Sequence, residues 1–285
     1  MFPDSLQISI RAPVNAFVES LVINYGGVFK AISLTILKVV VVFEGALRGL
    51  PWWAVILVFM ALAYLATRRL VFTAVVGALL MLVGVLGLWD LTMQTLALML
   101  VSTLIAVVLG LPIGILCAKS RAVRAVTLPV LDVMQTMPSF VYLIPVLMLF
   151  GLGKVPAIFA TIIYAVPPLI RLTDLGIRQV DAEVVEAATA FGASPARLLF
   201  GVELPLATPT IMAGLNQTIM MALSMVVVAS MIGARGLGEQ VLNGIQTLDV
   251  GKGLQAGIGI VILAVVLDRI TQGFGRSRAE EARNG

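Results

Sequence analysis

The stretch EAATAFG at residues 186–192, followed by VELP at residues 202–205, is a polar, helix-forming island in a chain otherwise dominated by long apolar runs. Alanine, glutamate and leucine favour helix along the island. Gly192, Ser194 and Pro195 interrupt that helix, because glycine suits a helix end, serine an N-cap and proline a first helical position. The stretch therefore predicts two short helices joined at Gly192. Such a unit between membrane spans suits an element that docks in a groove on a partner outside the bilayer.

The composition predicts a membrane protein. Of the 285 residues, 60% are hydrophobic and 12% are charged, and the mean hydropathy is +1.08. A soluble domain carries about 25% charged residues. The net charge of +4 needs no nucleic-acid partner, because lysine and arginine at span ends set the orientation of membrane proteins. With one cysteine, Cys117, and no histidine, the chain offers no Cys/His metal site, intrachain disulfide or imidazole chemistry. We therefore expect neither a metal site nor a catalytic residue.

Long apolar runs predict an all-α polytopic membrane protein with about seven transmembrane helices. The runs are residues 52–67, 70–89, 91–118, 130–150, 155–170, 206–232 and 254–270. The basic residues that separate them gather on one side, which predicts that this side is cytoplasmic. They are Arg68, Arg69, Lys119, Arg121, Arg124, Arg171, Arg178, Arg197, Arg276 and Arg278. The N-terminus is then extracytoplasmic and the C-terminus cytoplasmic, and Trp52, Trp53 and Trp89 form an aromatic belt at the outer interface.

Residues 28–47 are nearly apolar enough for a further span, but Lys38 and Glu44 interrupt them. A charge at mid-bilayer costs about 2.5–3.5 kcal/mol, so we expect an amphipathic helix in the outer interface; an eighth span is the alternative. The predicted organisation has four parts. They are an N-terminal extracytoplasmic or interfacial segment (1–50), two accessory transmembrane helices (51–90), a five-helix core (91–275) with a cytoplasmic loop (171–205), and a cytoplasmic tail (276–285).

The polar island resembles the EAA signature of permease subunits of binding-protein-dependent ABC importers. That signature is Glu-Ala-Ala, three residues, Gly, nine residues, and an aliphatic-x-Leu-Pro ending. The matching residues are Glu186, Ala187, Ala188, Gly192, Val202, Leu204 and Pro205, with Val202 in place of the commoner isoleucine. The resemblance implies a type I ABC importer permease fold whose loop inserts into a cleft of a separate ABC ATPase subunit. ATP and Mg would then bind that partner, so this chain would be no enzyme and would carry no cofactor.

A narrower resemblance covers residues 131–143, 166–173 and 209–218, which look like the glycine betaine, proline betaine and choline permeases of bacteria (the ProW, OpuAB and ChoW type). It implies a multi-pass inner-membrane permease that imports quaternary-amine osmoprotectants. The implied partners are a periplasmic or membrane-anchored substrate-binding protein and a second permease copy in a homodimer. The chain lacks the long N-terminal extension of some betaine permeases and in that respect resembles the choline permeases more.

The predicted sixth span carries the best candidates for the translocation pathway, which are Asn216, Gln217, Met220, Ser224 and Met225. Soft, weakly polar side chains suit a cation covered by methyl groups. The alternative is that each of them only packs or hydrogen-bonds between helices. We expect close helix packing also from two pairs of glycines four residues apart, Gly110 with Gly114 and Gly253 with Gly257. A second functional hypothesis is a secondary transporter of small osmolytes or amino acids, which would show inverted repeats. Co-purification with a soluble ATPase separates these hypotheses.

Overall fold

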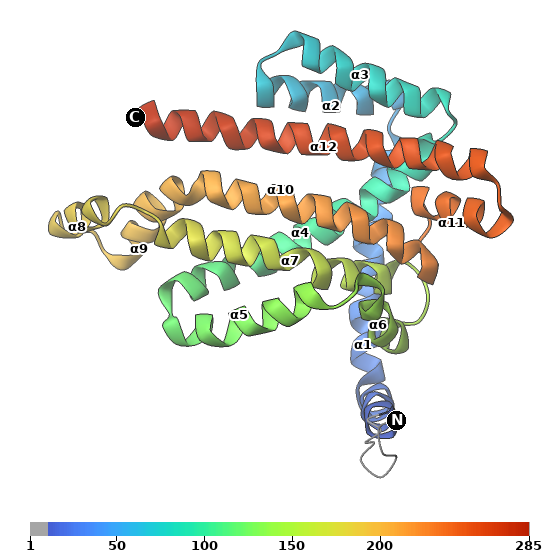
Figure 1. Cartoon of the computed structure of the whole chain (residues 1–285), viewed down its shortest axis with the longest axis horizontal. Helices are drawn as coiled ribbons and strands as arrows, with labels where there is room; N and C mark the ends of the chain where they lie inside the picture. The colour runs from blue at the N-terminus through green and yellow to red at the C-terminus, as the bar shows by residue number, and fades with distance from the viewer. Residues whose placement is uncertain (1–10, 285) are drawn as a thin grey trace, which may run out of the picture.

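The computed structural model describes residues 11–284, which are almost entirely helical (Figure 1). The first ten residues of the predicted N-terminal segment and Gly285 of the predicted tail lie outside the described residues. The α-helices are α1 (Arg11–Gly49), α2 (Trp52–Thr67), α3 (Leu70–Val85), α4 (Trp89–Lys119), α5 (Arg121–Thr136), α6 (Leu143–Phe150), α7 (Lys154–Arg178), α8 (Ala182–Ala190), α9 (Pro195–Leu198), α10 (Leu204–Val228), α11 (Leu237–Thr247) and α12 (Val250–Asn284). Short 3-10 turns form η2 (Ser139–Tyr142) and η4 (Ala229–Ile232), and a π-helical turn forms η3 (Leu199–Glu203).

Within the described residues, 5 helices are long and apolar enough to cross a membrane, or 6 if α5 and α6 count as one broken span. The 5 are α1, α4, α7, the continuous run from α9 through η4, and α12. Of the seven predicted spans, α2 and α3 are shorter apolar helices and the α5–α6 run is broken, whereas α1, which the sequence placed in the outer interface, is among the five. Helices α2 and α3 each have 16 residues, which at about 1.5 Å per residue falls short of a hydrocarbon core about 30 Å thick.

The predicted span at residues 130–150 is not one helix. It begins earlier, as α5 at Arg121, and breaks after Thr136, where the chain bends by 109° into η2 and α6. Pro138 explains the break, because proline has no N–H to donate and disfavours the helical conformation of the residue before it. Met137 accordingly takes an extended conformation, with φ −69° and ψ 135°.

Helix α7 is the centre of the bundle and packs between α4 and α10. A Cβ placed at Gly110 would lie 2.9 Å from Val166, and one at Gly114 would lie 2.6 Å from the Cβ of Thr173. On the other side of α7, a Cβ at Gly214 would lie 3.0 Å from Leu172. The close packing predicted for Gly110 and Gly114 is confirmed, whereas that predicted for Gly253 and Gly257 is wrong by the same measure, because a Cβ at either position would meet no atom within 4 Å. Helix α7 also continues to Arg178, so the polar loop predicted at residues 171–205 begins about two turns later than expected.

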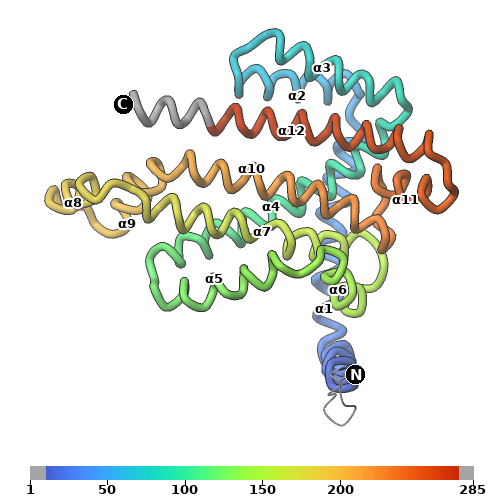
Figure 2. Tube along the Cα trace, viewed as in Figure 1, coloured from blue at the N-terminus to red at the C-terminus, as the bar shows by residue number. Residues whose placement is uncertain are grey.

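The bundle has two distinct ends. Figure 1 and Figure 2 show α8 and α9 at one end, together with the turns between α2 and α3 and between α4 and α5, and they show α6 and α11 at the other. Helix α11 lies between the predicted spans at residues 206–232 and 254–270. It packs tightly, because a Cβ at Gly238 would lie 2.7 Å from the carbonyl oxygen of Val227 and one at Gly244 would lie 2.7 Å from the nitrogen of Gly253.

Helix α1 runs across the direction that α7, α10 and α12 share (Figure 1). Its last turns are attached to the end of the bundle where α4 and α7 begin. Glu44, which is 8% exposed, pairs with Lys154 at the start of α7. Arg48 lies 3.3 Å from Asp90 in the first turn of α4. The carboxylate of Glu44, one of the two charges that interrupt the apolar run, is therefore neutralised at the bundle surface.

The α4–α7 contact gives a direct test of the packing. Gly114→Ala should destabilise the folded chain by about 1–3 kcal/mol, the usual cost of overpacking, because the new methyl group meets Thr173 and the carbonyl oxygen of Ile170. Gly257→Ala is the matched control, since no atom lies within 4 Å of its added Cβ. Thermal unfolding of the purified variants in detergent measures both effects. Equal midpoints for the two variants would contradict the packing.

Candidate functional site

The segment that links α7 to α10, residues 179–203, contains α8, α9 and η3 and is called here the α8–α9 segment. Asp181 caps α8 by accepting a hydrogen bond from the backbone N–H of Glu183 at 2.9 Å. At the other end, the N–H of Ala193 donates to the carbonyl of Ala188 at 3.1 Å around Gly192, whose φ is +79°. This is the bonding of a Schellman cap, in which glycine takes the left-handed conformation.

Helix α9 starts with the residues that the sequence predicts. The Oγ of Ser194 accepts a hydrogen bond from the N–H of Arg197 at 3.4 Å, and Pro195 occupies the first helical position. The prediction of two short helices joined at Gly192 is confirmed. Leu204 and Pro205 begin α10 directly after η3, so the π-helical turn ends just before Pro205, which has no N–H to donate.

The α8–α9 segment exposes two large aromatic side chains, one after α8 and one in η3. Phe191 is 94% exposed and Phe200 is 68% exposed. Glu186 and Ala187 of α8 are exposed as well, whereas Ala188 is partly buried. Large aromatic side chains in water are typical anchors of protein interfaces. Phe191 lies inside the quoted signature, but the sequence does not say whether such a residue packs inward or points outward, so its role was not predicted.

The predicted pathway residues of α10 separate into two groups. Gln217 and Ser224 are exposed and, with exposed Ala213 and partly buried Met220, follow one face of the helix; this face is called the open face of α10. Met225 is fully enclosed within the chain at 0% exposure. Polar side chains that face outward from a membrane helix are expensive in lipid and are typical of a polar or water-filled space.

Asn216 is not on the open face but joins α10 to α12. Its Nδ2 donates to Asp268 at 3.0 Å, and Gln272 of α12 donates to both oxygens of the same carboxylate at 2.8 and 2.9 Å. Thr271 donates to the amide oxygen of Asn216. Asn216 therefore hydrogen-bonds between helices, which is the structural alternative that the sequence left open.

Helix α5 adds polar groups on the exposed side of the bundle. Asp132, Gln135 and Thr136 are all exposed, and Asp132 pairs with Arg171 of α7. Because this arginine is a third exposed and its partner about two thirds exposed, the pair is accessible to solvent from the surface of the protomer.

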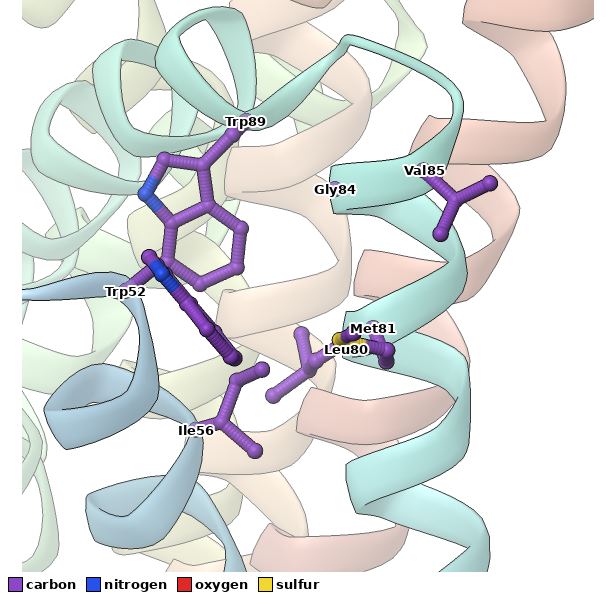
Figure 3. A pocket seen from close by; sticks show the side chains of 7 residues that line it. All are labelled: Trp52, Ile56, Leu80, Met81, Gly84, Val85 and Trp89. Carbon is purple, nitrogen blue, oxygen red and sulfur yellow. The ribbon is translucent and has the colours of Figure 1, made fainter.

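An apolar cavity of about 420 Å³ lies away from these groups, between α2, α3 and the start of α4. Figure 3 shows that its walls carry apolar side chains, with the rings of Trp52 and Trp89 close together at one end. The other lining residues are Ile56, Leu80, Met81, Gly84 and Val85. It contains no acidic side chain and no residue of α5, α7 or α10, so it is separate from the predicted pathway. Two of the three tryptophans predicted as an interfacial belt thus lie together.

Residues 110–279, more than half of the chain, match the family described as binding-protein-dependent transport system inner membrane component. The chain belongs to this family. It is 48% identical over 269 residues to the glycine betaine/proline betaine transport system permease protein ProW of Escherichia coli (strain K12), across 94% of this chain and 76% of that one. It is 46% identical over 284 residues to the glycine betaine/carnitine transport permease protein GbuB of Listeria monocytogenes serotype 1/2a (strain 10403S), across 98% of this chain and 100% of that one.

The fold matches a solved importer as well. Inward-facing MetNI, a methionine ABC transporter, aligns with a TM-score of 0.59 at 22% identity, over 67% of this chain and 95% of the matched chain. The architecture is therefore that of a type I ABC importer permease. As a member of this family, the chain is a multi-pass inner-membrane permease subunit and not an enzyme, and it works with an ATPase and a substrate-binding protein. The secondary-transporter hypothesis is set aside.

The open face of α10 predicts where water reaches the chain in its assembled, membrane-embedded form. In a chain whose buried Cys117 is replaced by alanine, we expect Gln217→Cys and Ser224→Cys to react with a charged thiol reagent about tenfold faster than the control, because the reactive thiolate forms only near water. The control is Val261→Cys on α12, which is 60% exposed but apolar in its surroundings. Equally slow labelling at all three positions would rule out a water-lined face.

Proposed function

We propose that this chain forms the translocation pathway of an ATP-driven importer for small quaternary-amine osmolytes that also carry a carboxylate, of which glycine betaine is the simplest. The observation that carries the proposal is the α8–α9 segment. It places the signature residues Glu186, Ala187, Ala188 and Gly192 and the exposed Phe191 at one end of the bundle, ready for an ATPase subunit. Leu204 and Pro205 then transmit the movement of that segment into α10.

The substrate class is supported by what the relatives share. ProW is named for glycine betaine and proline betaine, and GbuB for glycine betaine and carnitine. These compounds combine a quaternary ammonium with a carboxylate and have no net charge. The open face of α10 carries amide, hydroxyl and thioether groups at Gln217, Ser224 and Met220 but no charge. Such a surface suits a zwitterion covered in methyl groups, because it has no charged side chain that would bind the substrate too tightly for release.

Chain length does not favour choline. The whole of GbuB is covered by an alignment of 284 residues, so a short chain is also found among permeases named for glycine betaine. The choice among quaternary amines falls mainly to the delivery protein, where aromatic cages bind such cations.

A second copy of the chain completes the pathway in our proposal. Gln217 and Ser224 would face hydrocarbon in a lone protomer, which is unfavourable for polar groups. A homodimer in which the two open faces of α10 line a common space, with α5 and the Asp132–Arg171 pair beside them, gives these groups polar surroundings.

The proposed orientation has the α8–α9 segment in the cytoplasm, the C-terminus on the same side and the N-terminus outside. The turns between α2 and α3 and between α4 and α5 carry Arg68, Arg69, Lys119 and Arg121 and lie toward the same end as α8 and α9 (Figure 1). An excess of basic residues marks the cytoplasmic side.

Helix α1 then lies in the outer interface. It joins the bundle at the end opposite α8 and α9, through Glu44 and Arg48. It leaves Lys30 and Lys38 exposed among apolar side chains. In a helix that crosses the bilayer each lysine would cost about 2.5–3.5 kcal/mol, whereas in the interface both reach water.

The test is reconstitution in liposomes with the ATPase and the substrate-binding protein of the same importer. We expect import of glycine betaine that requires both ATP inside and the binding protein outside, with proline betaine, carnitine and choline measured in parallel. Import driven by an ion gradient without ATP would contradict the function. Import of choline alone, with no zwitterion carried, would contradict the substrate class and leave the ATP-driven mechanism standing.

Glu186 gives the sharpest test of docking. Glu186→Lys should weaken binding of the ATPase by about 30-fold or more, because loss of a central interface residue costs about 2 kcal/mol or more. The spans should remain folded, since this side chain is exposed and α8 has no buried residue. Glu239→Lys makes the same charge change in α11, at the other end of the bundle, and should leave ATPase binding unchanged. Wild-type affinity in Glu186→Lys would remove that residue from the interface.

A further inference from the structure

The turn between α4 and α5 carries basic residues that reach across the bundle, and residues 119–124 are called here the α4–α5 corner. Lys119 is the last residue of α4, and Arg124 lies in the first turn of α5. The Oγ of Ser120, between the two helices, accepts a hydrogen bond from the N–H of Val123 at 3.3 Å and caps α5. The corner is therefore a well-formed helix start that holds two cations in place.

Two buried carboxylates meet these cations. Glu203 is 7% exposed and pairs with Lys119, which is 84 residues away in sequence. Asp174 is 3% exposed and accepts a hydrogen bond from the Nε of Arg124 at 3.1 Å. The Nε of Arg178 lies 3.2 Å from the other oxygen of Asp174. A buried carboxylate that loses its cation is strongly destabilised, so the Lys119–Glu203 contact resists separation, whereas Asp174 would keep Arg178 of its own helix if Arg124 moved away.

The two carboxylates stand at the two roots of the α8–α9 segment. Asp174 lies in the final turns of α7, just before the segment leaves the bundle, and Glu203 is its last residue before α10 begins. Both roots are therefore fastened to the same corner, although α4 and α5 have no direct chain connection to the segment.

The Glu203 root has an unusual backbone. Leu199–Glu203 forms a π-helical turn, in which the N–H of Leu204 bonds to the carbonyl of Leu199. Such turns are rare and are found mostly where a helix serves a function. Here the turn lies where α9 runs into α10 without an intervening loop, and it ends on the residue that pairs with Lys119.

We propose that the α4–α5 corner is a mechanical joint that carries movement of the α8–α9 segment into α4 and α5. This inference rests on the proposed function, in which an ATPase moves that segment. Helices α7 and α10 follow the segment through the covalent chain, and α4 and α5 pack on α7. The pairs Lys119–Glu203 and Arg124–Asp174 additionally tie the adjoining ends of α4 and α5 to the two roots of the segment. Lys119 and Glu203 are thus positioning residues that set how much import each ATP hydrolysed produces.

The test measures import per ATP hydrolysed in liposomes that contain the complete complex. Lys119→Met should still bind the ATPase and hydrolyse ATP, while the ratio falls by about fivefold or more, the lower end of typical coupling between sites. The exchanged pair Lys119→Glu with Glu203→Lys should restore the ratio. Arg121→Met is the matched control on the same corner, since Arg121 is exposed and forms no ion pair within the described part of the chain.

The proposed joint is overturned if the Lys119→Met complex folds and imports as much substrate per ATP as the wild type. It is also overturned if the exchanged pair does not restore the wild-type ratio of import to ATP hydrolysis. If Lys119→Met fails to assemble, the exchanged pair decides alone: normal assembly and ratio support the joint, and failure to restore them overturns it. A wild-type chain that imports without ATP refutes the proposed function itself. If import by the wild type requires ATP and Lys119→Met has the same ratio of import to ATP hydrolysis, only the joint is refuted.

Discussion

A carboxylate that leaves water needs a cation or hydrogen-bond donors in exchange, and this requirement joins the helix ends of the protein. Among the described residues, Glu44, Asp174 and Glu203 are the acidic residues below a tenth exposed, and each faces a cation from another helix. Desolvating an isolated ion costs several kcal/mol, which only a well-placed partner offsets. The pairs thereby fix which helix ends are neighbours: α1 with α7, α5 with α7, and η3 with α4.

Within the bundle the same requirement is met by neutral groups. Asp268 has amide donors from Asn216 and Gln272, so α10 is attached to α12 along one side. Gln217 follows Asn216 but is turned by about 100° around the helix axis, which places it on the open face. The adjacent residues Asn216 and Gln217 therefore have different roles, one in bonding to α12 and one on the open face. The positions of the neighbouring helices decide which residue takes which role.

The sequence predicted most reliably what local chemistry controls. Gly192 and Ser194 needed no distant contact to define the α8–α9 turn, and composition alone was sufficient for an all-helical membrane fold. It failed where distant partners decide. Charges at Arg171 and Asp174 indicated a loop, yet α7 continues through them because their partners Asp132 and Arg124 are 39 and 50 residues away. The exposure of Phe191 and the enclosure of Met225 depend on the whole packing and have no local signal.

The packing around α7 also determines how far a displacement of the α8–α9 segment spreads. A Cβ at Gly176 would lie 3.0 Å from Thr210, so α7 and α10 are in backbone contact and move together. Helix α12 follows α10 through Asp268. The α2–α3 hairpin follows α12, because a Cβ at Gly273 would lie 2.9 Å from Ala66. Helix α5 has no such glycine contact in the described bundle, and it packs on α4 and α7 through apolar side chains around the buried Leu131. Its ion pairs with α7, Arg124–Asp174 and Asp132–Arg171, add to this packing, so α5 responds with α7 when the segment moves.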